Sequence, residues 1–226
     1  MESGARLVGT RLALAGALLY LSEWLVIPFA ADLPTDDLGE DAAAIASAYA
    51  GHGTELGFLT GWVSFALLGR ILFITALRSA LRQSPRALTF LDVAVAAMVL
   101  SVAVEIVQLG LVSTAAWLAE ADAEAATVVA LDGAGTVFFG LVLVPLGASV
   151  LASSAAMLAS GLLTRWLGWL GIVAGTLVVA GGIINATGAG DTGTVHDVAD
   201  PLTGPPVALL WIWMIATSVV LFRRAT

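Results

Sequence analysis

Long apolar stretches alternate with short polar ones along the whole chain. A helix needs about 20 apolar residues to cross the roughly 30 Å hydrocarbon layer of a bilayer. Six stretches approach or exceed that length, at residues 12–30, 57–77, 90–118, 128–157, 166–184 and 207–222. Only helices and closed barrels span lipid. The pattern therefore predicts an all-α fold, a six-transmembrane-helix bundle that forms a single integral membrane domain over residues 1–226.

Two of the polar stretches are longer than the others. Residues 31–56 predict an outer loop with a short helix, which Asp41 would cap, residues 42–49 would form and Gly51 would end. Residues 185–206 are rich in Gly, Asp and Pro and predict an irregular outer loop.

Composition supports lipid as the solvent of this chain. Of its 226 residues, 59% are hydrophobic and only 12% are charged, about half the charged fraction of a soluble domain. The mean hydropathy is +0.99. The absence of cysteine excludes disulfides and thiolate metal sites. The absence of lysine excludes a retinal Schiff base.

The arginines mark one side of the predicted membrane. Outside the spans they occur before the first, between the second and third, between the fourth and fifth, and after the sixth: Arg6, Arg11, Arg78, Arg82, Arg86, Arg165, Arg223 and Arg224. The other loops are acidic. The positive-inside rule then predicts cytoplasmic termini in a plasma (inner) membrane. The net charge of −8 is thus an asymmetry across the membrane, and few, clustered arginines do not indicate a nucleic-acid partner.

Three charged residues fall in the middle third of the predicted spans, Glu23, Arg70 and Glu105. A lone charge at a helix centre costs about 2.5–3.5 kcal/mol on insertion scales, so these side chains should face the bundle interior. We predict that Arg70 contacts Glu105 or Glu23. Ser101, Glu105 and Gln108 share one helix face, because they lie at i−4, i and i+3. Asp132, near the end of its span, is expected to be a wet helix-end residue.

Small and aromatic residues suggest how the helices pack. Gly168, Gly171, Gly175 and Gly182 lie near one face of their helix, which predicts close contact with a neighbour. Six tryptophans are expected at the membrane boundaries: Trp62, Trp117, Trp211 and Trp213 on the outer side, and Trp166 and Trp169 on the inner side. Trp24 lies deeper and could line the interior.

The motifs of metal and phosphate chemistry are weak here. His52 and Glu55 are three residues apart, and His196 precedes Asp197. Two histidines and two carboxylates could ligate zinc, but their spacing matches no recognised metal motif. No glycine-rich phosphate loop and no nucleophile elbow occurs. We therefore expect no metal site and no cofactor.

Two segments carry a resemblance to a known family. FFGLVLVPLGASVLAS at 138–153 and SGLLTRWLGWLGIVAG at 160–175 resemble a family of bacterial six-span membrane proteins that is defined only as a domain of unknown function. That family has Leu-Pro-x-Gly in its fourth helix and Ser-Gly-x-x-x-Arg-x-Leu-Gly leading into its fifth. Further matches are Arg11, Leu19-Tyr20-Leu21, Ala76-Leu77-Arg78, Leu81, Glu105 and Gln108. The family tends to lack a charge at the position of Arg70. The resemblance implies the six-span fold and no activity.

The buried charges allow a structural and a functional interpretation. In the first, the ion pair only fixes helix packing. In the second, a polar cavity at Arg70, Glu105 and Glu23 binds a lipid or other apolar small molecule, and the residues expected to contact it are Arg70, Ser101, Gln108, Trp24, Tyr20 and Phe65. Alternatively, Glu105 and Glu23 are catalytic in an intramembrane enzyme that protonates a polyprenyl or terpenoid chain. A proton-coupled transporter is the third possibility, and this one would require a homo-oligomer, because no inverted repeat is visible.

Overall fold

The computed structural model describes residues 2–26, 41–188 and 194–224. Within these ranges the chain is helical, apart from short turns, and contains no strand. The elements are α1 (Glu2–Leu21), the 3-10 turn η1 (Ser22–Leu25), α2 (Ala42–Tyr49), α3 (Gly53–Leu81), α4 (Pro85–Glu120), α5 (Ala125–Ser160), α6 (Arg165–Gly188) and α7 (Thr194–Arg223).

Five of the described helices, α3 to α7, are long and apolar enough to cross a membrane. They contain the second to sixth apolar stretches of the sequence, and they make the chain a multi-pass membrane protein. The first apolar stretch is divided differently from the prediction. Its helix α1 begins ten residues earlier and ends at Leu21, η1 follows, and residues 27–30 lie outside the described part of the chain.

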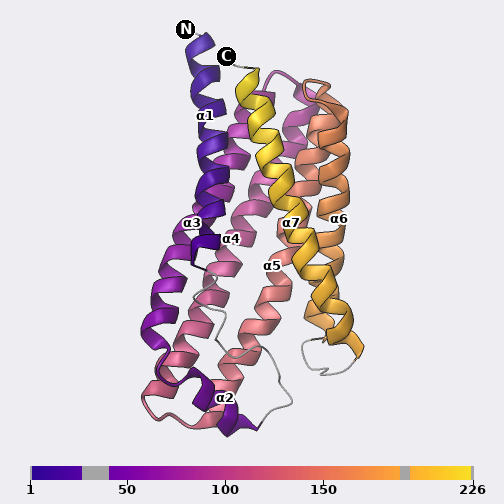
Figure 1. The fold of residues 1–226 in the computed structure, drawn as a ribbon. Coiled ribbons are helices and arrows are strands. Elements are labelled where there is room, and N and C mark those ends of the chain that lie inside the picture. The colour runs from indigo at the N-terminus through magenta and orange to yellow at the C-terminus, as the bar shows by residue number, and fades with distance from the viewer. Residues whose placement is uncertain (1, 27–40, 189–193, 225–226) are drawn as a thin grey trace.

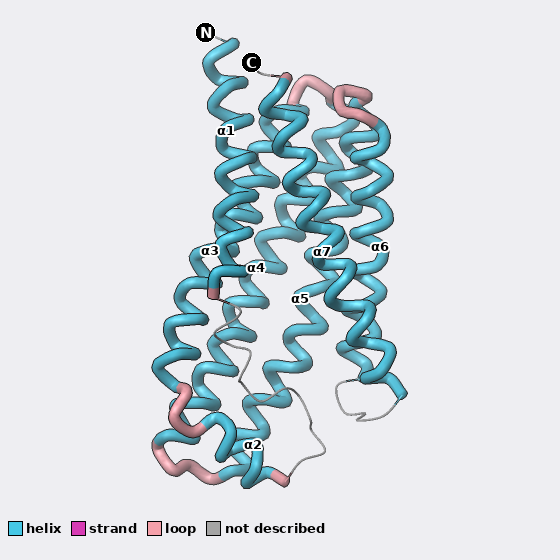
Figure 2. Tube along the Cα trace, in the orientation of Figure 1, coloured by secondary structure: helices cyan, strands magenta, loops and turns pink. Residues whose placement is uncertain are grey.

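The long helices pack side by side in chain order (Figure 1). The most extensive contacts join α3 to α4, α4 to α5, α5 to α6 and α6 to α7, and α1 packs against both α3 and α7. The helices α1 and α3 to α7 therefore form a closed ring. The start of α1 and the end of α7 lie at the same end of this ring, and α2 lies at the opposite end (Figure 2).

Glycines allow two pairs of helices to approach closely. A methyl group at Gly16 of α1 would lie 2.6 Å from the carbonyl oxygen of Gly69 in α3, and one at Gly147 of α5 would lie 2.7 Å from that of Gly175 in α6. Small residues at helix interfaces permit such backbone contact in lipid. The four glycines predicted to form a packing face, Gly168, Gly171, Gly175 and Gly182, all contact α5, which confirms that prediction.

The helix α2 occupies the residues that the sequence predicted, with the Asp41 side chain accepting from the Ala43 amide. It packs on α4 and α5 through a small apolar cluster that includes Ile45 and Tyr49. The Tyr49 hydroxyl donates a hydrogen bond to Asp132, which is buried. The expectation that Asp132 is a wet helix-end residue is therefore wrong. The reason is that α2, from a distant part of the sequence, covers it.

The prediction of an irregular loop over residues 185–206 is wrong for residues 185–188 and 194–206, and residues 189–193 lie outside the described part of the chain. The helix α6 continues to Gly188, and α7 is already helical from Thr194. At the end of α6, Ala186 still packs against Gly140 of α5, and the Thr187 hydroxyl donates to the Ile183 and Ile184 carbonyls. Contact with α5 thus extends the helix past the point where local composition predicts its end.

Two tryptophans predicted at the outer boundary lie in the core instead. Trp213 is fully buried, stacks edge-on against Phe73 and donates from Nε1 to the Leu167 carbonyl. Trp211 is buried as well. The two residues are two positions apart, so their side chains point about 200° apart around α7. Trp211 contacts Tyr20 of α1, and Trp213 contacts Phe73 of α3 and Leu167 of α6.

Candidate functional site

The approach of α1 to α3 places a tyrosine beside the buried arginine. Gly69 lets α1 come into backbone contact just before Arg70 in the sequence. Tyr20 lies one helical turn after Gly16, on the same face of α1. The Arg70 guanidinium consequently lies over the Tyr20 ring, 4.1 Å from its centroid, and its Nη2 donates to the Tyr20 hydroxyl.

The Arg70 guanidinium also forms a two-pronged ion pair with Glu105 of α4. Nη1 donates to Oε2, and Nη2 donates to Oε1 at 3.2 Å. The side chains are only 4% and 11% exposed, so the pair is shielded from solvent. This contact confirms the prediction that Arg70 pairs with Glu105 or Glu23. A fork of this kind is the strongest hydrogen-bond arrangement available to a carboxylate.

Glu23 in η1 brings a second carboxylate to the cluster. It lies near enough to Arg70 and Glu105 to interact electrostatically with both. Its Oε2 atom is buried and has no hydrogen-bond partner among the described residues, and the same is true of Arg70 Nε. One guanidinium and two carboxylates give a formal charge of −1 unless a carboxyl holds a proton. A buried net charge is costly. Among the described residues the cluster thus has an open acceptor, Glu23 Oε2, and an open donor, Arg70 Nε.

An aromatic group borders the cluster on the α7 side. The Trp211 ring lies 4.9 Å from that of Tyr20 and 5.0 Å, edge-on, from that of Trp24. Trp24 is 52% exposed, so it covers the outside of the cluster and does not line an enclosed interior. Sequence reasoning missed Trp211, since its distance from the helix end suggested a boundary position. The sequence carries no signal for the direction in which α7 is turned.

The structure does not bring the remaining predicted site residues into the cluster. Ser101 donates to the Val142 carbonyl of α5 at 3.2 Å, and so it joins α4 to α5. Phe65 is 53% exposed and packs against Trp62 on the outer surface of α3. Gln108 is half-buried. Ser101 and Glu105, on one face of α4, therefore contact two different neighbours, α5 and α3.

The candidate metal ligands remain apart from this cluster. His52 Nδ1 lies 3.0 Å from Glu55 Oε2 at the start of α3. Within the part of the chain that the structure describes, no three His, Asp or Glu side chains converge. The side chains of His196 and Asp197 lie outside that part.

Comparisons with protein-family models, with curated proteins and with solved structures found no match to this chain. The resemblance of residues 138–175 to a six-span family stays a prediction. The function of the chain is therefore inferred from the geometry of the Tyr20–Glu23–Arg70–Glu105 cluster.

Proposed function

We propose that the chain is a six-span plasma-membrane protein whose Tyr20–Glu23–Arg70–Glu105 cluster binds a lipid or other apolar molecule with a hydrogen-bond donor, such as a hydroxyl or amine, at its polar end. The observation that carries the proposal is Glu23 Oε2, which is buried without a partner among the described residues. Arg70 is already engaged by Glu105 and Tyr20. A donor from a ligand would satisfy the remaining carboxylate oxygen, which otherwise loses hydration without compensation.

The surroundings of Glu23 suit an apolar ligand that arrives from the membrane. Leu25, next to Trp24, is strongly exposed, as is Leu18 one turn before Ser22. In a multi-pass protein such exposed apolar side chains face lipid, because lipid tails solvate them without cost. The ligand's apolar body would lie along these side chains and the Trp24 ring, while its polar end reaches Glu23.

Retention of the ligand on purification tests this proposal. Glu23→Leu should lower the amount of copurifying molecule about tenfold or more, since a hydrogen bond to a charged acceptor is worth about 1.5–3 kcal/mol. Native mass spectrometry of the protein released from micelles gives the readout. Glu55→Leu is the matched control, because it removes an exposed carboxylate outside the cluster. Equal retention in both variants would reject the proposal.

The six-span topology and its orientation form part of the same proposal. The first span would comprise α1, η1 and the residues after them. The start of α1, the α3–α4 turn, the α5–α6 turn and the end of α7 share one end of the ring, since residues of all four line one pocket. All of these segments carry arginine, and the positive-inside rule places that end in the cytoplasm.

Cysteine labelling tests the orientation, and the chain has no cysteine of its own to interfere. Ala121→Cys, in the α4–α5 turn, should react with a membrane-impermeant maleimide added to intact cells. Gln83→Cys, in the α3–α4 turn, should react only after the cells are permeabilised. The opposite accessibility would overturn the topology.

One observation favours a second candidate, an intramembrane acid catalyst. Glu23 interacts electrostatically with Tyr20, whose ring, like that of Trp24, contacts the ring of Trp211, and aromatic faces stabilise cations. A protonated Glu23 could transfer its proton to an alkene carbon of a polyprenyl or terpenoid chain, and the rings would stabilise the resulting carbocation. The Glu23 carboxylate would then take a proton from the carbon next to the cation, which gives an isomer of the substrate and restores the acid. Conversion of the copurifying molecule to an isomer on incubation would support catalysis. Recovery of the copurifying molecule unchanged would support binding without catalysis.

A further inference from the structure

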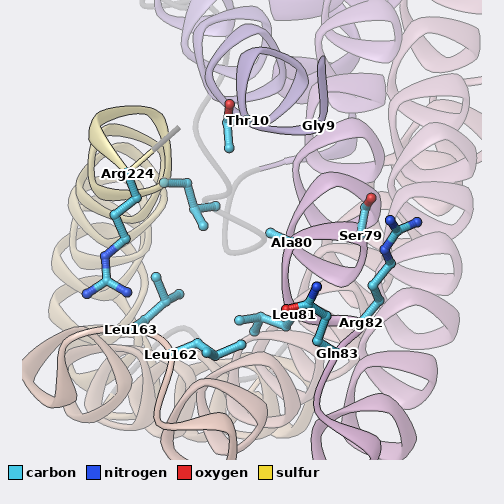
Figure 3. A pocket seen from close by; sticks show the side chains of 11 residues that line it. Gly9, Thr10, Ser79, Ala80, Leu81, Arg82, Gln83, Leu162, Leu163 and Arg224 are labelled. Atoms are coloured by element: carbon cyan, nitrogen blue, oxygen red, sulfur yellow. The ribbon is translucent and has the colours of Figure 1, made fainter. Parts of the chain in front are cut away.

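A pocket opens at the arginine-rich end of the ring, away from the Glu23 cluster (Figure 3). Four separate parts of the chain surround it: α1, the end of α3, the α5–α6 turn and the end of α7. Its cavity volume is about 190 Å³, and it is partly open to solvent. Its lining residues are Gly9, Thr10, Ser79, Ala80, Leu81, Arg82, Gln83, Leu162, Leu163, Leu221 and Arg224.

The wall of this pocket is apolar at its base and basic at its edge. Leu81, Leu163 and Leu221 are buried. Arg82 and Arg224 are exposed and lie on opposite sides of the opening (Figure 3). Among the described residues that line the pocket there is no carboxylate, and neither arginine forms an ion pair with another described side chain.

The position of the pocket indicates which class of ligand can reach it. It lies where the apolar helices α3 and α7 end and the arginine-bearing turns begin. In a membrane this is the depth of the lipid headgroups, where arginines attract anionic lipids. Leu162, 40% exposed at the pocket's edge, continues the apolar surface toward the acyl chains. An amphiphile with an anionic head and an aliphatic tail matches both parts of the wall.

We propose that this pocket is a specific site for an anionic phospholipid. Arg82 and Arg224 bind the phosphate from two sides, Gln83 supplies a further donor, and an acyl chain runs along Leu162 toward Leu163. Arginine suits this role, because its guanidinium recognises phosphate by paired hydrogen bonds. Arginines near helix C-termini also offset the helix dipoles. The helix-dipole effect accounts for arginines at these positions, but it does not account for a pocket whose leucine base lies between Arg82 and Arg224.

The test compares lipid retention by matched arginine variants. Wild-type protein is reconstituted into nanodiscs of phosphatidylcholine with or without phosphatidylglycerol, released from them, and weighed by native mass spectrometry. Arg82→Gln and Arg224→Gln should each lower phosphatidylglycerol retention about fivefold, since one arginine is worth about 1 kcal/mol near an anionic surface. Arg86→Gln is the control, because Arg86 is exposed on α4 and does not line the pocket. Equal losses in all three variants would overturn the proposal.

Further measurements distinguish a phospholipid from free phosphate, and this pocket from the Glu23 site. Millimolar inorganic phosphate should not displace the lipid, whereas displacement would show a headgroup-only anion site and overturn the lipid assignment. Leu162→Asn should lower phosphatidylglycerol retention, and no change would overturn the acyl-chain contact. Glu23→Leu should leave phosphatidylglycerol retention unchanged, so failure of the Glu23 proposal and failure of this one give different results. Equal retention of phosphatidylcholine by the wild type would also contradict the proposal.

Discussion

Two ion pairs between an arginine and a carboxylate join α3 to α4, and they differ in depth and in exposure. Arg70 and Glu105 lie deep in the ring, with 4% and 11% of their side chains exposed. Arg78 and Asp92 lie two helical turns nearer the arginine-rich end, 2.7 Å apart, with 46% and 60% exposed. Water competes for the second pair and not for the first.

The difference shows which charges the fold depends on. A buried pair gains little over an apolar pair of the same shape, but removing one partner leaves an uncompensated charge. An exposed pair can lose either partner, because water replaces it. Arg70 also contacts Tyr20, so its loss affects α1, α3 and α4 together, whereas loss of Arg78 affects one contact on the surface.

The largest effect is expected from Arg70→Met. It should destabilise the protein by about 3–5 kcal/mol, since Glu105 stays buried without a partner. The double change Arg70→Met/Glu105→Leu should restore part of that loss. Unfolding in mixed micelles, followed by the fluorescence of the seven tryptophans, measures both. Strictly additive losses would mean that the two side chains do not interact energetically.

A smaller effect is expected from Tyr20→Phe, which keeps the ring over Arg70 and removes the hydroxyl. The loss should be about 1–2 kcal/mol, because the hydrogen bond has a charged donor. The same unfolding assay applies. In the Arg70→Met background the hydroxyl has no guanidinium to bind, and the effect should shrink. If Tyr20→Phe lowered the free energy of unfolding equally in the Arg70→Met background, the loss would not come from the hydrogen bond to Arg70.

The smallest effect is expected from Asp92→Asn at the exposed pair. The free energy of unfolding should fall by no more than about 1 kcal/mol. About 1 M salt should reduce the difference between the variant and the wild type, because it shortens the screening length for exposed charges to about 3 Å. The loss from Arg70→Met should persist at the same salt concentration. A salt-resistant loss for Asp92→Asn would show that water does not reach this pair.

The sequence predicts the features that follow from the cost of polar groups in lipid. Apolar stretch length finds α3 to α7, and the cost of a lone charge pairs Arg70 with Glu105 or Glu23; the structure shows the pair with Glu105. Glycine spacing identifies the face of α6 that meets α5. Each of these features depends on the sequence of one helix or on the energetic cost of one charged side chain in lipid, so local sequence is sufficient.

The features that were not predicted depend on how separate helices are turned against one another. Trp211 and Trp213 are buried because two sides of α7 contact other helices, Trp211 with α1 and Trp213 with α3 and α6. No residue in α7 specifies those contacts alone. Asp132 is buried because α2 folds back over α5. Residues 185–188 stay helical because Ala186 contacts Gly140. The partial separation of the site residues has the same cause, since Ser101 and Glu105 share a face of α4 that touches two helices.

The contact of α1 with α7, which closes the ring, has a consequence for the order of assembly during translation. Helices leave the ribosome in chain order, so Tyr20, Arg70 and Glu105 have all entered the membrane once α4 is made. The buried charge is compensated at that stage, with three helices still to come. Trp211 reaches Tyr20 and Trp24 only with the last helix. The cell therefore inserts the costly arginine early beside its partner, and the aromatic cover over Glu23 is completed at the end of synthesis.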